Sequence, residues 1–449
     1  MKNNNALVKK YSELLKKNNV IDKELYDKYN VKRGLRNPDG TGVLVGLTEI
    51  GDVHSYIIDE GDKIPVEGRL FYRGIDLYDL VGGINKDKRF GYEECVYLLL
   101  FGELPNAQEL EEFKMLLGKN RQLPPSFAED NIFKVPSTDI MNMLARGVLV
   151  FYSYDDNPED LSVEHHVEQC IQLIAKLPTL TAYAYQAKMH YFKNDSLYIH
   201  YPKPELSTAE NLLHMIRPDT NYTRLEAETL DLMLILHAEH GGGNNSTFVT
   251  HVISSTGTDI YSAISAALGS LKGPLHGGAN AKVLDMFDDI KENVRDWEDE
   301  DEINHYLRKI VAKNAFDRRG LIYGMGHAVY TISDPRAVLI KEKAKELAKS
   351  KGMLKEYNLY AAVEKLAPAI INESKGTNKP ICANVDFYSG FVYRMLGIPF
   401  DLYTPLFAVG RIAGWCAHRI EEIMCGGKII RPAYKSVSGR KKYVELKDR

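Results

Sequence analysis

Helical periodicity is the feature that most constrains the fold of this 449-residue chain. From Tyr92 onward, apolar residues recur three and four positions apart, as at Val167, Ile171 and Ile174, and this spacing is typical of helices with one buried face. The pattern predicts a mainly α-helical fold. The expected helices cover residues 92–100, 107–117, 137–152, 165–190, 225–237, 259–271, 303–313, 335–350, 359–372, 389–395 and 403–424.

The N-terminal part of the chain has a different composition. Residues 11–29 predict one or two charged, mostly exposed helices, whereas glycines and short alternating segments predict a small β-rich region over about residues 40–75. The strands expected there cover residues 42–45, 54–58 and 70–72, and little β structure is expected afterwards. Residues 191–206 are rich in proline and tyrosine and predict a loop.

The bulk composition fits an ordinary protein with a large core, since 44% of the residues are hydrophobic and 26% are charged. The net charge of −4 is small for this length, so neither nucleic acid nor an anionic membrane is expected as a partner. The N-terminal residues lack the apolar stretch of a secretory signal, and apolar runs such as residues 96–101 are too short to span a bilayer. We therefore expect a soluble, cytoplasmic protein.

The five cysteines are widely spaced and form no CxxC pair, so the sequence indicates neither a disulfide framework nor a zinc site. Three of them lie among apolar residues, where buried thiols are expected. Free thiols in a reducing compartment are therefore expected at Cys95, Cys170, Cys382, Cys416 and Cys425.

Two histidines lie in loops with glycines nearby, where the backbone lets a small ligand approach closely. His276 stands in Gly-Pro-Leu-His-Gly-Gly, and His327 ends Gly-Met-Gly-His. A helix is expected just after His276, and the positive end of its dipole favours the neutral imidazole. A neutral imidazole can donate a hydrogen bond to an oxygen that gains charge, which suits chemistry on a carbonyl compound. The alternative for His276 is a loop histidine with one structural hydrogen bond.

Charged residues near these loops supply a carboxylate and two guanidinium groups. Asp386, in Asn-Val-Asp-Phe-Tyr-Ser-Gly, is either the cap of the helix expected from residue 389 or a partly desolvated base. Arg336, in Asp-Pro-Arg, is either a bidentate clamp for a carboxylate or half of a surface ion pair. Arg411 shares a helical face with Trp415 and Arg419 in an apolar stretch, so it needs an anionic partner from the protein or from a ligand.

A further pair of histidines, His237 and His240, is expected on one helical face. Such a pair could bind a metal, play a structural role or bind a substrate, and a metal site would need a third ligand. The glycine-rich segment 241–245 is expected to end this helix in a flexible turn with many backbone donors. Such a turn suits an anionic ligand.

None of these signals is specific by itself, but their order along the chain resembles the citrate synthase family. The resemblance runs from about Gly42 to Lys435, nearly the whole chain. It rests on Leu-Phe-Tyr-Arg-Gly-Ile at 70–75, Leu-Leu-Leu-Phe-Gly-Glu-Leu-Pro at 98–105, Asn-Ser-Thr-Phe at 245–248, Ser-Thr-Gly-Thr-Asp-Ile-Tyr-Ser-Ala at 255–263, Gly-Pro-Leu-His-Gly-Gly-Ala-Asn at 273–280, Gly-Met-Gly-His at 324–327, Asp-Pro-Arg-Ala at 334–337 and Asn-Val-Asp-Phe-Tyr-Ser-Gly at 384–390.

The resemblance implies an almost all-helical, two-domain enzyme that works as a homodimer or a higher oligomer, with its active site in the cleft between the domains. The implied boundaries are residues 1–275 for the first part of the large domain, 276–386 for the small domain and 387–449 for the rest of the large domain. Oxaloacetate would bind first and close the small domain.

The resemblance also implies a reaction of the tricarboxylic acid cycle. Acetyl-CoA would condense with oxaloacetate, and citryl-CoA would be hydrolysed to citrate and CoA, with no metal and no bound cofactor. Asp386 would remove a methyl proton from acetyl-CoA while His276 hydrogen-bonds the thioester oxygen, and His327 would polarise and protonate the oxaloacetate carbonyl. The residues implied to hold oxaloacetate are His240, Arg336, Arg411 and, from the neighbouring subunit, Arg431.

CoA contacts are implied at Gly324, Met325, Gly326 and Lys379. The chain departs from the family pattern here, because residues 328–333 contain no basic side chain, whereas members of the family commonly place one there that meets the CoA phosphates. Lys379 could substitute for it, as could Lys341 or Lys343. A milder departure is Glu239, which stands where many members have aspartate.

Three alternatives stay open at this point. A 2-methylcitrate synthase would condense propionyl-CoA with oxaloacetate on the same scaffold, and one methyl group in a pocket is worth only about 1–3 kcal/mol. A catalytically silent homologue is disfavoured because His276, His327 and Asp386 are all retained. A metal-dependent hydrolase is the third alternative, and EDTA would distinguish it.

Overall fold

The computed structural model describes residues 2–38, 40–60 and 62–449, and the chain divides into two compact units with the boundary between Leu47 and Thr48. The N-terminal unit holds helices α1 (Lys2–Asn18) and α2 (Glu24–Lys28) and the 3-10 turn η1 (Arg33–Leu35). The helices expected within residues 11–29 are confirmed, although α1 begins earlier and residues 19–23 separate it from α2.

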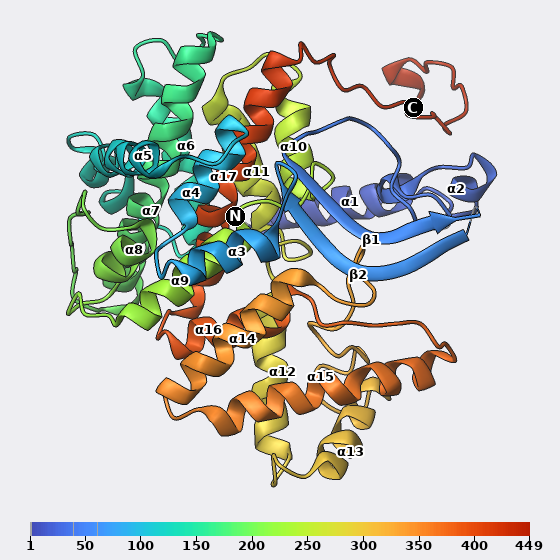
Figure 1. Ribbon diagram of the computed structural model, residues 1–449. Helices are drawn as coiled ribbons and strands as arrows, with labels where there is room; N and C mark the ends of the chain where they lie inside the picture. The colour runs from blue at the N-terminus through green and yellow to red at the C-terminus, as the bar shows by residue number, and fades with distance from the viewer. Residues whose placement is uncertain (1, 39, 61) are drawn as a thin grey trace. The chain divides into compact units, whose positions relative to one another are not determined.

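The main unit begins with an antiparallel sheet of strand order β1-β2-β3 (Figure 1). β1 (Gly51–Asp59) pairs with β2 (Asp62–Tyr72), which also pairs with the short β3 (Ile75–Asp76). The strands expected at 54–58 and 70–72 are confirmed. The strand expected at 42–45 is wrong: Gly42 makes only an isolated bridge with Arg36, and the Leu44 side chain is 84% exposed, so no neighbouring surface buries that segment.

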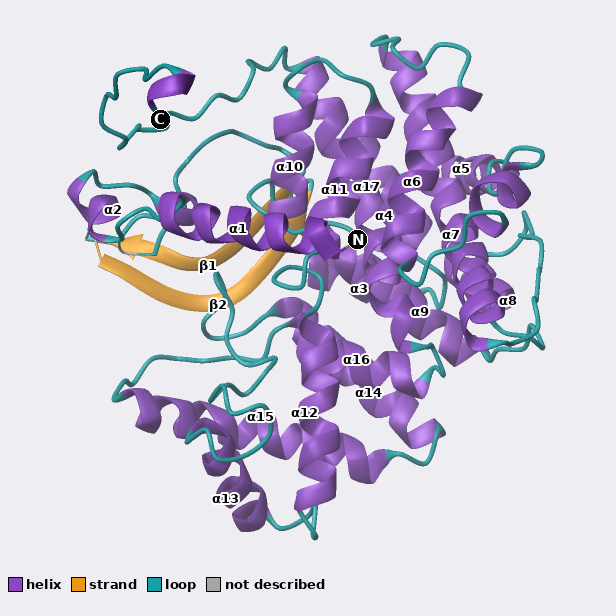
Figure 2. Cartoon of the chain, turned by 180° about the vertical axis from the view of Figure 1, so that it is seen from behind, coloured by secondary structure: helices purple, strands orange, loops and turns teal. Residues whose placement is uncertain are grey.

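Helices make up most of the main unit (Figure 2). They are α3 (Leu77–Lys86), α4 (Tyr92–Phe101), α5 (Ala107–Lys119), α6 (Ile140–Phe151), α7 (Val163–Lys193), α8 (Thr208–Ile216), α9 (Arg224–His237), α10 (Asn245–Ser254), α11 (Ile260–Lys272), α12 (Ala279–Asn293), α13 (Glu300–Val311), α14 (Pro335–Ser350), α15 (Leu354–Lys375), α16 (Val385–Met395) and α17 (Tyr403–Met424). Short turns are η2 (Glu129–Phe133), η3 (Tyr152–Tyr154), η4 (Phe400–Leu402) and η5 (Leu446–Asp448). The mainly helical fold is confirmed, and each helix expected from the periodicity is present, most of them with shifted ends.

Three helices were not expected from the sequence: α3, α8 and α10. α3 and α8 begin at side-chain caps, since Asp76 accepts the N–H of Tyr78 and Ser207 forms a capping box with Glu210. α10 follows the glycine-rich segment directly. The turn expected at 241–245 is present over residues 241–244, and it joins two helices.

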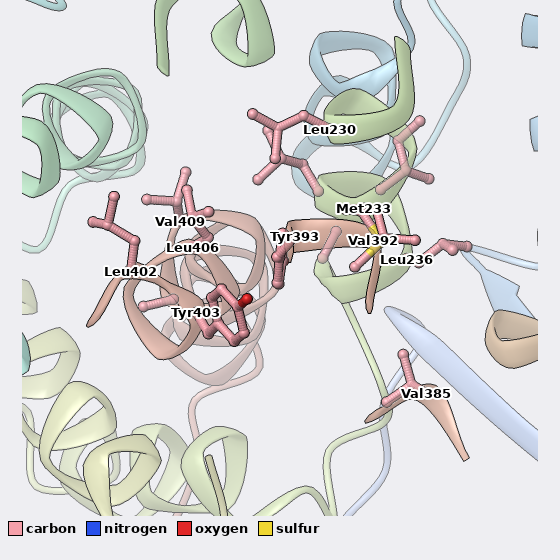
Figure 3. Packing of buried hydrophobic residues seen from close by; sticks show 14 of the residues in the cluster. Leu230, Met233, Leu236, Val385, Val392, Tyr393, Leu402, Tyr403, Leu406 and Val409 are labelled. Atoms are coloured by element: carbon pink, nitrogen blue, oxygen red, sulfur yellow. The ribbon is translucent and has the colours of Figure 1, made fainter. Parts of the chain in front are cut away.

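The hydrophobic core around α17 positions the functional side chains. α17 packs against α4, α7, α9, α10 and α11, and Figure 3 shows Leu406 and Tyr403 of α17 in one cluster with Tyr393 of α16 and Met233 of α9. Gly414 allows α17 to approach very closely, because a Cβ there would lie 2.4 Å from the carbonyl oxygen of Ala238. α17 therefore lies directly against the segment that follows α9.

The helices α12–α16 pack largely with one another. α12 and α14 contact α16, α13 contacts α15, and α14 contacts both α15 and α9. α12, α13 and α15 lie together in the lower part of Figure 1. The division into domains at residues 275/276 and 386/387 stays a prediction.

The structure also bears on two expectations from composition, which concern membrane-spanning segments and the state of the cysteines. No helix within the described ranges is long and apolar enough to cross a membrane. All five cysteines are free; Cys425 is exposed and the others are buried.

Candidate active site

Two of the glycine-containing loops are joined by backbone hydrogen bonds. Met325 forms an antiparallel bridge with Ala383, and the N–H of Gly326 donates to the carbonyl of Cys382 at 2.7 Å. The N–H of Asn384 donates in turn to the carbonyl of Gly324 at 2.8 Å. The pairing holds the loop that ends at His327 against the start of α16.

Asp386 lies in the first turn of α16, which begins earlier than residue 389. The cap of this helix is Asn384, whose side chain accepts the N–H of Asp386 at 3.0 Å, so the capping role considered for Asp386 is wrong. Within the described chain, the Asp386 carboxylate accepts no hydrogen bond. Burial raises its pKa to about 6, although the nearby Arg336 acts in the opposite direction. This carboxyl group is suited to take up a proton near neutral pH.

His276 lies between α11 and α12 and is held by Ser246. Its Nε2 lies 3.4 Å from the N–H of Ser246 and 3.1 Å from Oγ, and that Oγ donates to Asn244 and accepts from Trp415 Nε1. Nε2 is therefore an acceptor, and the ring hydrogen is on Nδ1. Burial, with a further contribution from Arg411, lowers the pKa of His276 to about 4. The imidazole is neutral, as expected, although burial rather than the helix dipole is the main cause.

His327 is fixed in the opposite tautomer. Its Nδ1 accepts the N–H of Val329 at 3.0 Å and that of Tyr330 at 3.1 Å, so a neutral ring carries its hydrogen on Nε2. Nε2 lies 3.4 Å from Nη2 of Arg336, and the ring centre lies 5.3 Å from that of His240. Three of the predicted site residues are thus brought together, and because arginine only donates, Nε2–H of His327 and Nη2 of Arg336 are two neighbouring donors that could share a ligand oxygen.

Arg336 is held by Asp334, and the surface ion pair considered for it is wrong because Arg336 is only 3% exposed. Asp334 caps α14 and accepts from Nε at 3.0 Å and from Nη2 at 2.8 Å. The same carboxylate accepts the N–H of Val385 at 3.2 Å. Burial alone would lower the pKa of Arg336, but Asp334 raises it above its ordinary value, so the guanidinium stays charged. Asp334 links this guanidinium to the helix that carries Asp386.

Arg411 is fully buried in α17 with part of its guanidinium unused. Nε donates to the carbonyl of His237 at 2.6 Å, and the group lies 4.8 Å from the centre of the Phe407 ring. Nη1 and Nη2 have no partner within the described chain. Burial lowers the pKa of Arg411 to about 10, which leaves it charged at neutral pH. No carboxylate of the described chain hydrogen-bonds to Nη1 or Nη2, although Glu239 is near enough to raise the pKa of Arg411.

The expected placement of His237 and His240 on one helix is wrong. α9 ends at His237, whose ring packs 4.3 Å from Phe407, and His240 lies in the turn beyond it. The Nε2 of His240 is buried without a partner in the described chain, and burial holds its pKa well below the ordinary value. No group of three or more His, Cys, Asp or Glu side chains that could hold a metal ion occurs among the residues that the structure describes.

Arg431 lies outside this cluster. It is exposed in the extended tail after α17, where the neighbouring N–H of Ile430 donates to Ser255 Oγ at 3.1 Å. Its action across a subunit interface stays a prediction.

The lysines considered for CoA differ in their surroundings. Lys341 pairs with Glu364 at 2.6 Å, and Lys343 pairs with Glu346 at 2.9 Å. Lys379 is exposed and lines a pocket of about 390 Å³ that also includes Thr331 and Asn372. Lys379 is thus better placed to bind a phosphate than Lys341 or Lys343. The other residues considered for CoA, Gly324, Met325 and Gly326, form the loop before His327.

Several residues of the site were quoted in the sequence motifs without a role. Ser246 orients His276, Asp334 orients Arg336, and Asn384 caps α16. The order Asp-Pro-Arg is a recognisable helix start, with a capping side chain before proline, and would have identified Asp334. The role of Ser246 has no comparable local signal.

Comparison with known proteins gives consistent matches over most of the chain. The family model described as citrate synthase, C-terminal domain, matches residues 39–433. The citrate synthase of Haloferax volcanii is 36% identical over 411 residues, which cover 90% of this chain and 94% of the relative. The 2-methylcitrate synthase of Shewanella oneidensis is 33% identical, with 83% of this chain and 90% of the relative covered. A solved ternary complex of citrate synthase from Thermoplasma acidophilum with carboxymethyl coenzyme A and oxaloacetate has a TM-score of 0.76 at 28% identity, and covers 93% of this chain and 99% of that one.

The matches identify an acyltransferase-type enzyme, whose helical fold brings a neutral His276, a carboxylate of raised pKa and buried arginines into the candidate site. With these matches beside it, the chain belongs to the citrate synthase family.

Proposed function

We propose that this protein condenses acetyl-CoA with oxaloacetate and hydrolyses the resulting citryl-CoA to citrate and CoA. The observation that carries the proposal is Arg411, a fully buried cation with two unpartnered nitrogens within the described chain. A buried charge without a counter-charge is costly, so a site that keeps one is suited to an anionic ligand. Oxaloacetate carries two carboxylates and a ketone, which match two arginines and a set of neutral imidazoles.

Oxaloacetate would lie between Arg411 and Arg336, with a hydrogen bond to the unpartnered Nε2 of His240. Arginine grips a carboxylate with two parallel hydrogen bonds, and both guanidinium groups here are buried. Arg431 of a second subunit would complete the site. The proposal is supported by the Thermoplasma acidophilum citrate synthase, whose ternary complex contains oxaloacetate.

Asp386 and His276 would then generate the nucleophile. The carboxylate takes a proton from the methyl group of acetyl-CoA, while Nδ1–H of His276 donates to the thioester oxygen as charge moves onto it. The rise in the pKa of Asp386 from 3.8 to about 6 corresponds to about 3 kcal/mol in favour of its protonated form, which makes it a stronger base. A positioned general base supplies roughly 10²–10⁴-fold, and the donor at the developing oxyanion supplies an electrostatic contribution.

His327 would assist the condensation step. The new carbon nucleophile attacks the ketone carbon of oxaloacetate, and the ketone oxygen takes the hydrogen from Nε2 of His327. The proton that Asp386 took from acetyl-CoA returns to His327 through water, so both side chains regain their starting states. The product is citryl-CoA, a thioester. Water attacks that thioester, the C–S bond breaks, and citrate and the CoA thiol leave. The histidines and arginines stabilise the charge at both carbonyl oxygens, so these steps require no metal.

The CoA chain would run past the loop 324–326 toward the pocket beside Lys379. Gly326, at φ +88°, has open space where a side chain would stand, so its lack of one keeps this path clear. Lys379 would contact a phosphate in place of the basic residue absent from 328–333.

The test is release of free thiol with oxaloacetate and acetyl-CoA, run beside propionyl-CoA and in the presence of EDTA. Fast, oxaloacetate-dependent release that prefers acetyl-CoA would support the proposal. A preference for propionyl-CoA would instead assign the chain as a 2-methylcitrate synthase, the activity named for the Shewanella oneidensis relative. No release from either thioester would point to a silent homologue, and loss of activity in EDTA would point to a metal-dependent reaction.

The role of Asp386 has its own test. We expect Asp386→Ala to lower kcat by roughly 10²–10⁴-fold, because the general base is removed. The dissociation constant of oxaloacetate should stay close to the wild-type value, since Arg411 and His240 are unchanged. Calorimetry and single-turnover rates separate the two effects. Weak oxaloacetate binding combined with normal turnover at saturation would contradict the assignment.

A further inference from the structure

Four titratable side chains next to the site form a continuous chain of contacts that the proposed reaction does not use. Oε1 of Glu239 lies 3.1 Å from Nε2 of His418. Nδ1 of His418 lies 3.1 Å from Nε2 of His251, and Nδ1 of His251 lies 2.8 Å from Oε2 of Glu422. Glu239 and His418 are fully buried, whereas the other two are half-buried.

The number of ring hydrogens in this chain follows from its two ends. An ionised carboxylate only accepts, so Nε2 of His418 and Nδ1 of His251 both carry a hydrogen. The contact between the two rings needs one hydrogen more. Two neutral imidazoles hold two hydrogens in total, and this chain uses three. One of the two rings is therefore an imidazolium.

The surroundings place the charge on His418. Its ring faces Glu239 and also a second carboxylate, Glu421, whose Oε2 lies 3.8 Å from Nδ1, whereas His251 contacts Glu422 and interacts with Glu421 only at longer range. A charged His418 donates from both nitrogens, and His251 is then neutral with its hydrogen on Nδ1. Burial and the neighbouring His418 both lower the pKa of His251, in agreement with a neutral ring. On Glu239, burial raises the pKa, but His418 outweighs it and the net shift is downward.

This buried ion pair holds a carboxylate that adjoins two substrate-binding residues. Glu239 precedes His240, and its Oε1 also accepts the N–H of Gly241, which closes the turn around His240. Glu239 also interacts electrostatically with Arg411. If Glu239 lost its cation, its carboxylate would turn to Arg411 as a replacement partner and compete with an anionic substrate.

We propose that His418 is a positioning residue for the oxaloacetate site: as an imidazolium it holds and neutralises Glu239, and so keeps Nη1 and Nη2 of Arg411 available to the substrate. The inference rests on the proposed function, because it takes oxaloacetate as the ligand of Arg411.

The first test is calorimetric binding of oxaloacetate by three folded variants. His418→Leu leaves Glu239 without a cation, and we expect the dissociation constant to rise at least tenfold. His418→Gln carries no charge but can still donate from its amide to Glu239, so it should lose less affinity than His418→Leu. The double variant His418→Leu/Glu239→Gln removes the competing charge and should recover affinity relative to His418→Leu. Equal loss in the single and double variants would overturn the proposal, because a packing defect is not relieved by Glu239→Gln.

The second test needs no change in the protein under study and holds even if His418→Leu does not fold. Nitrogen-15 spectra of wild-type protein labelled at histidine, with His418 assigned from the His418→Gln spectrum, report how many ring nitrogens carry hydrogen. We expect both nitrogens of His418 to carry hydrogen at neutral pH and His251 to be neutral. A neutral His418 would overturn the inference. Wild-type protein that fails to bind oxaloacetate would overturn the proposed function itself, a result that no His418 variant can mimic.

Discussion

Asp386 illustrates how the surroundings of one residue set its chemistry. An aspartate beside the arginine Arg336 would ordinarily have a depressed pKa, yet here burial outweighs that charge. Asn384 performs the capping, which leaves the Asp386 carboxylate free of backbone hydrogen bonds that would stabilise its ionised form. The residue is consequently a base of useful strength near neutral pH.

The pH dependence of activity should follow this carboxylate on the acid side. Only the deprotonated form acts as a base, so kcat/KM for acetyl-CoA should fall about tenfold per pH unit below a pKa of about 6. His276, with a pKa of about 4, stays neutral through this range and adds no second slope. Initial rates from about pH 5 to 8 check the expectation. A profile that stays flat down to about pH 5 would contradict it.

Arg411 should lower the free energy of unfolding of the ligand-free protein. We expect Arg411→Met to raise the free energy of unfolding by about 1 kcal/mol, because it removes a buried cation with unpartnered nitrogens. The same variant should lose its response to oxaloacetate in thermal melts. Arg419 provides the matched control: it is equally buried on α17 but donates to the carbonyls of Ser254 and Thr258, so Arg419→Met should destabilise. Destabilisation of similar size by both substitutions would contradict this account.

The sequence indicated which residues lie together in the candidate site better than it indicated their hydrogen-bonding states. His276, His327 and Arg411 are identified by glycine-containing loops and by an arginine in an apolar helix, which are local signals. Which ring nitrogen carries hydrogen depends on Ser246 and on the backbone at Val329, and these contacts arise only in the folded chain. The pairing of Glu239 with His418 joins residues 179 positions apart, so no local pattern could indicate it.

At the scale of elements, the junction between the loop 324–327 and α16 controls two functional groups at once. Gly324 lies against α16, and a Cβ there would be 3.0 Å from the Cα of Phe387, in a backbone conformation with φ +81°. The loop cannot move away without breaking its bridge to residues 382–384. His327 and Asp386 therefore depend on this one close approach.

Substitution at the two loop glycines should separate steric contact from backbone strain. Gly324→Ala should lower the free energy of unfolding by about 1–3 kcal/mol and reduce kcat, because both the contact with Phe387 and the φ value oppose a side chain. Gly326→Ala is the control, since it has a similar φ of +88° but open space around the added carbon. Denaturant unfolding and steady-state rates measure both variants. Equal effects would show that backbone conformation alone matters.

The elements themselves were largely predictable. Helices with regular apolar spacing, such as α14 and α17, begin and end where the sequence indicated. α8 was not predicted, although the capping box of Ser207 and Glu210 marks its start. α10 was not predicted because it follows a run of glycines, which is typical of a loop. The strand expected at 42–45 failed because β propensity has no consequence without a partner strand.

At the scale of the whole molecule, the exposed Arg431 allows a direct test of whether one subunit completes the site of another. If it completes the site of a neighbouring subunit, Arg431→Ala should weaken oxaloacetate binding about tenfold or more while the dimer stays intact. Arg440→Ala, in the same exposed tail, is the control and should bind normally. Mixing Arg431→Ala with Arg411→Met subunits should restore one complete site per mixed dimer. Absence of any recovered activity, with mixed dimers shown by mass spectrometry, would contradict action across the interface.

The unpartnered nitrogens of Arg411 also bear on how long the protein survives in a cell. A ligand that supplies a missing buried contact stabilises the folded chain by about 2.7 kcal/mol at a hundred times its dissociation constant. Differences of about 1–2 kcal/mol change the abundance of a protein several-fold, because proteases remove the unfolded fraction. If oxaloacetate is that ligand, as proposed, cells short of it would degrade this protein faster, so that the supply of the ligand would influence the amount of the protein.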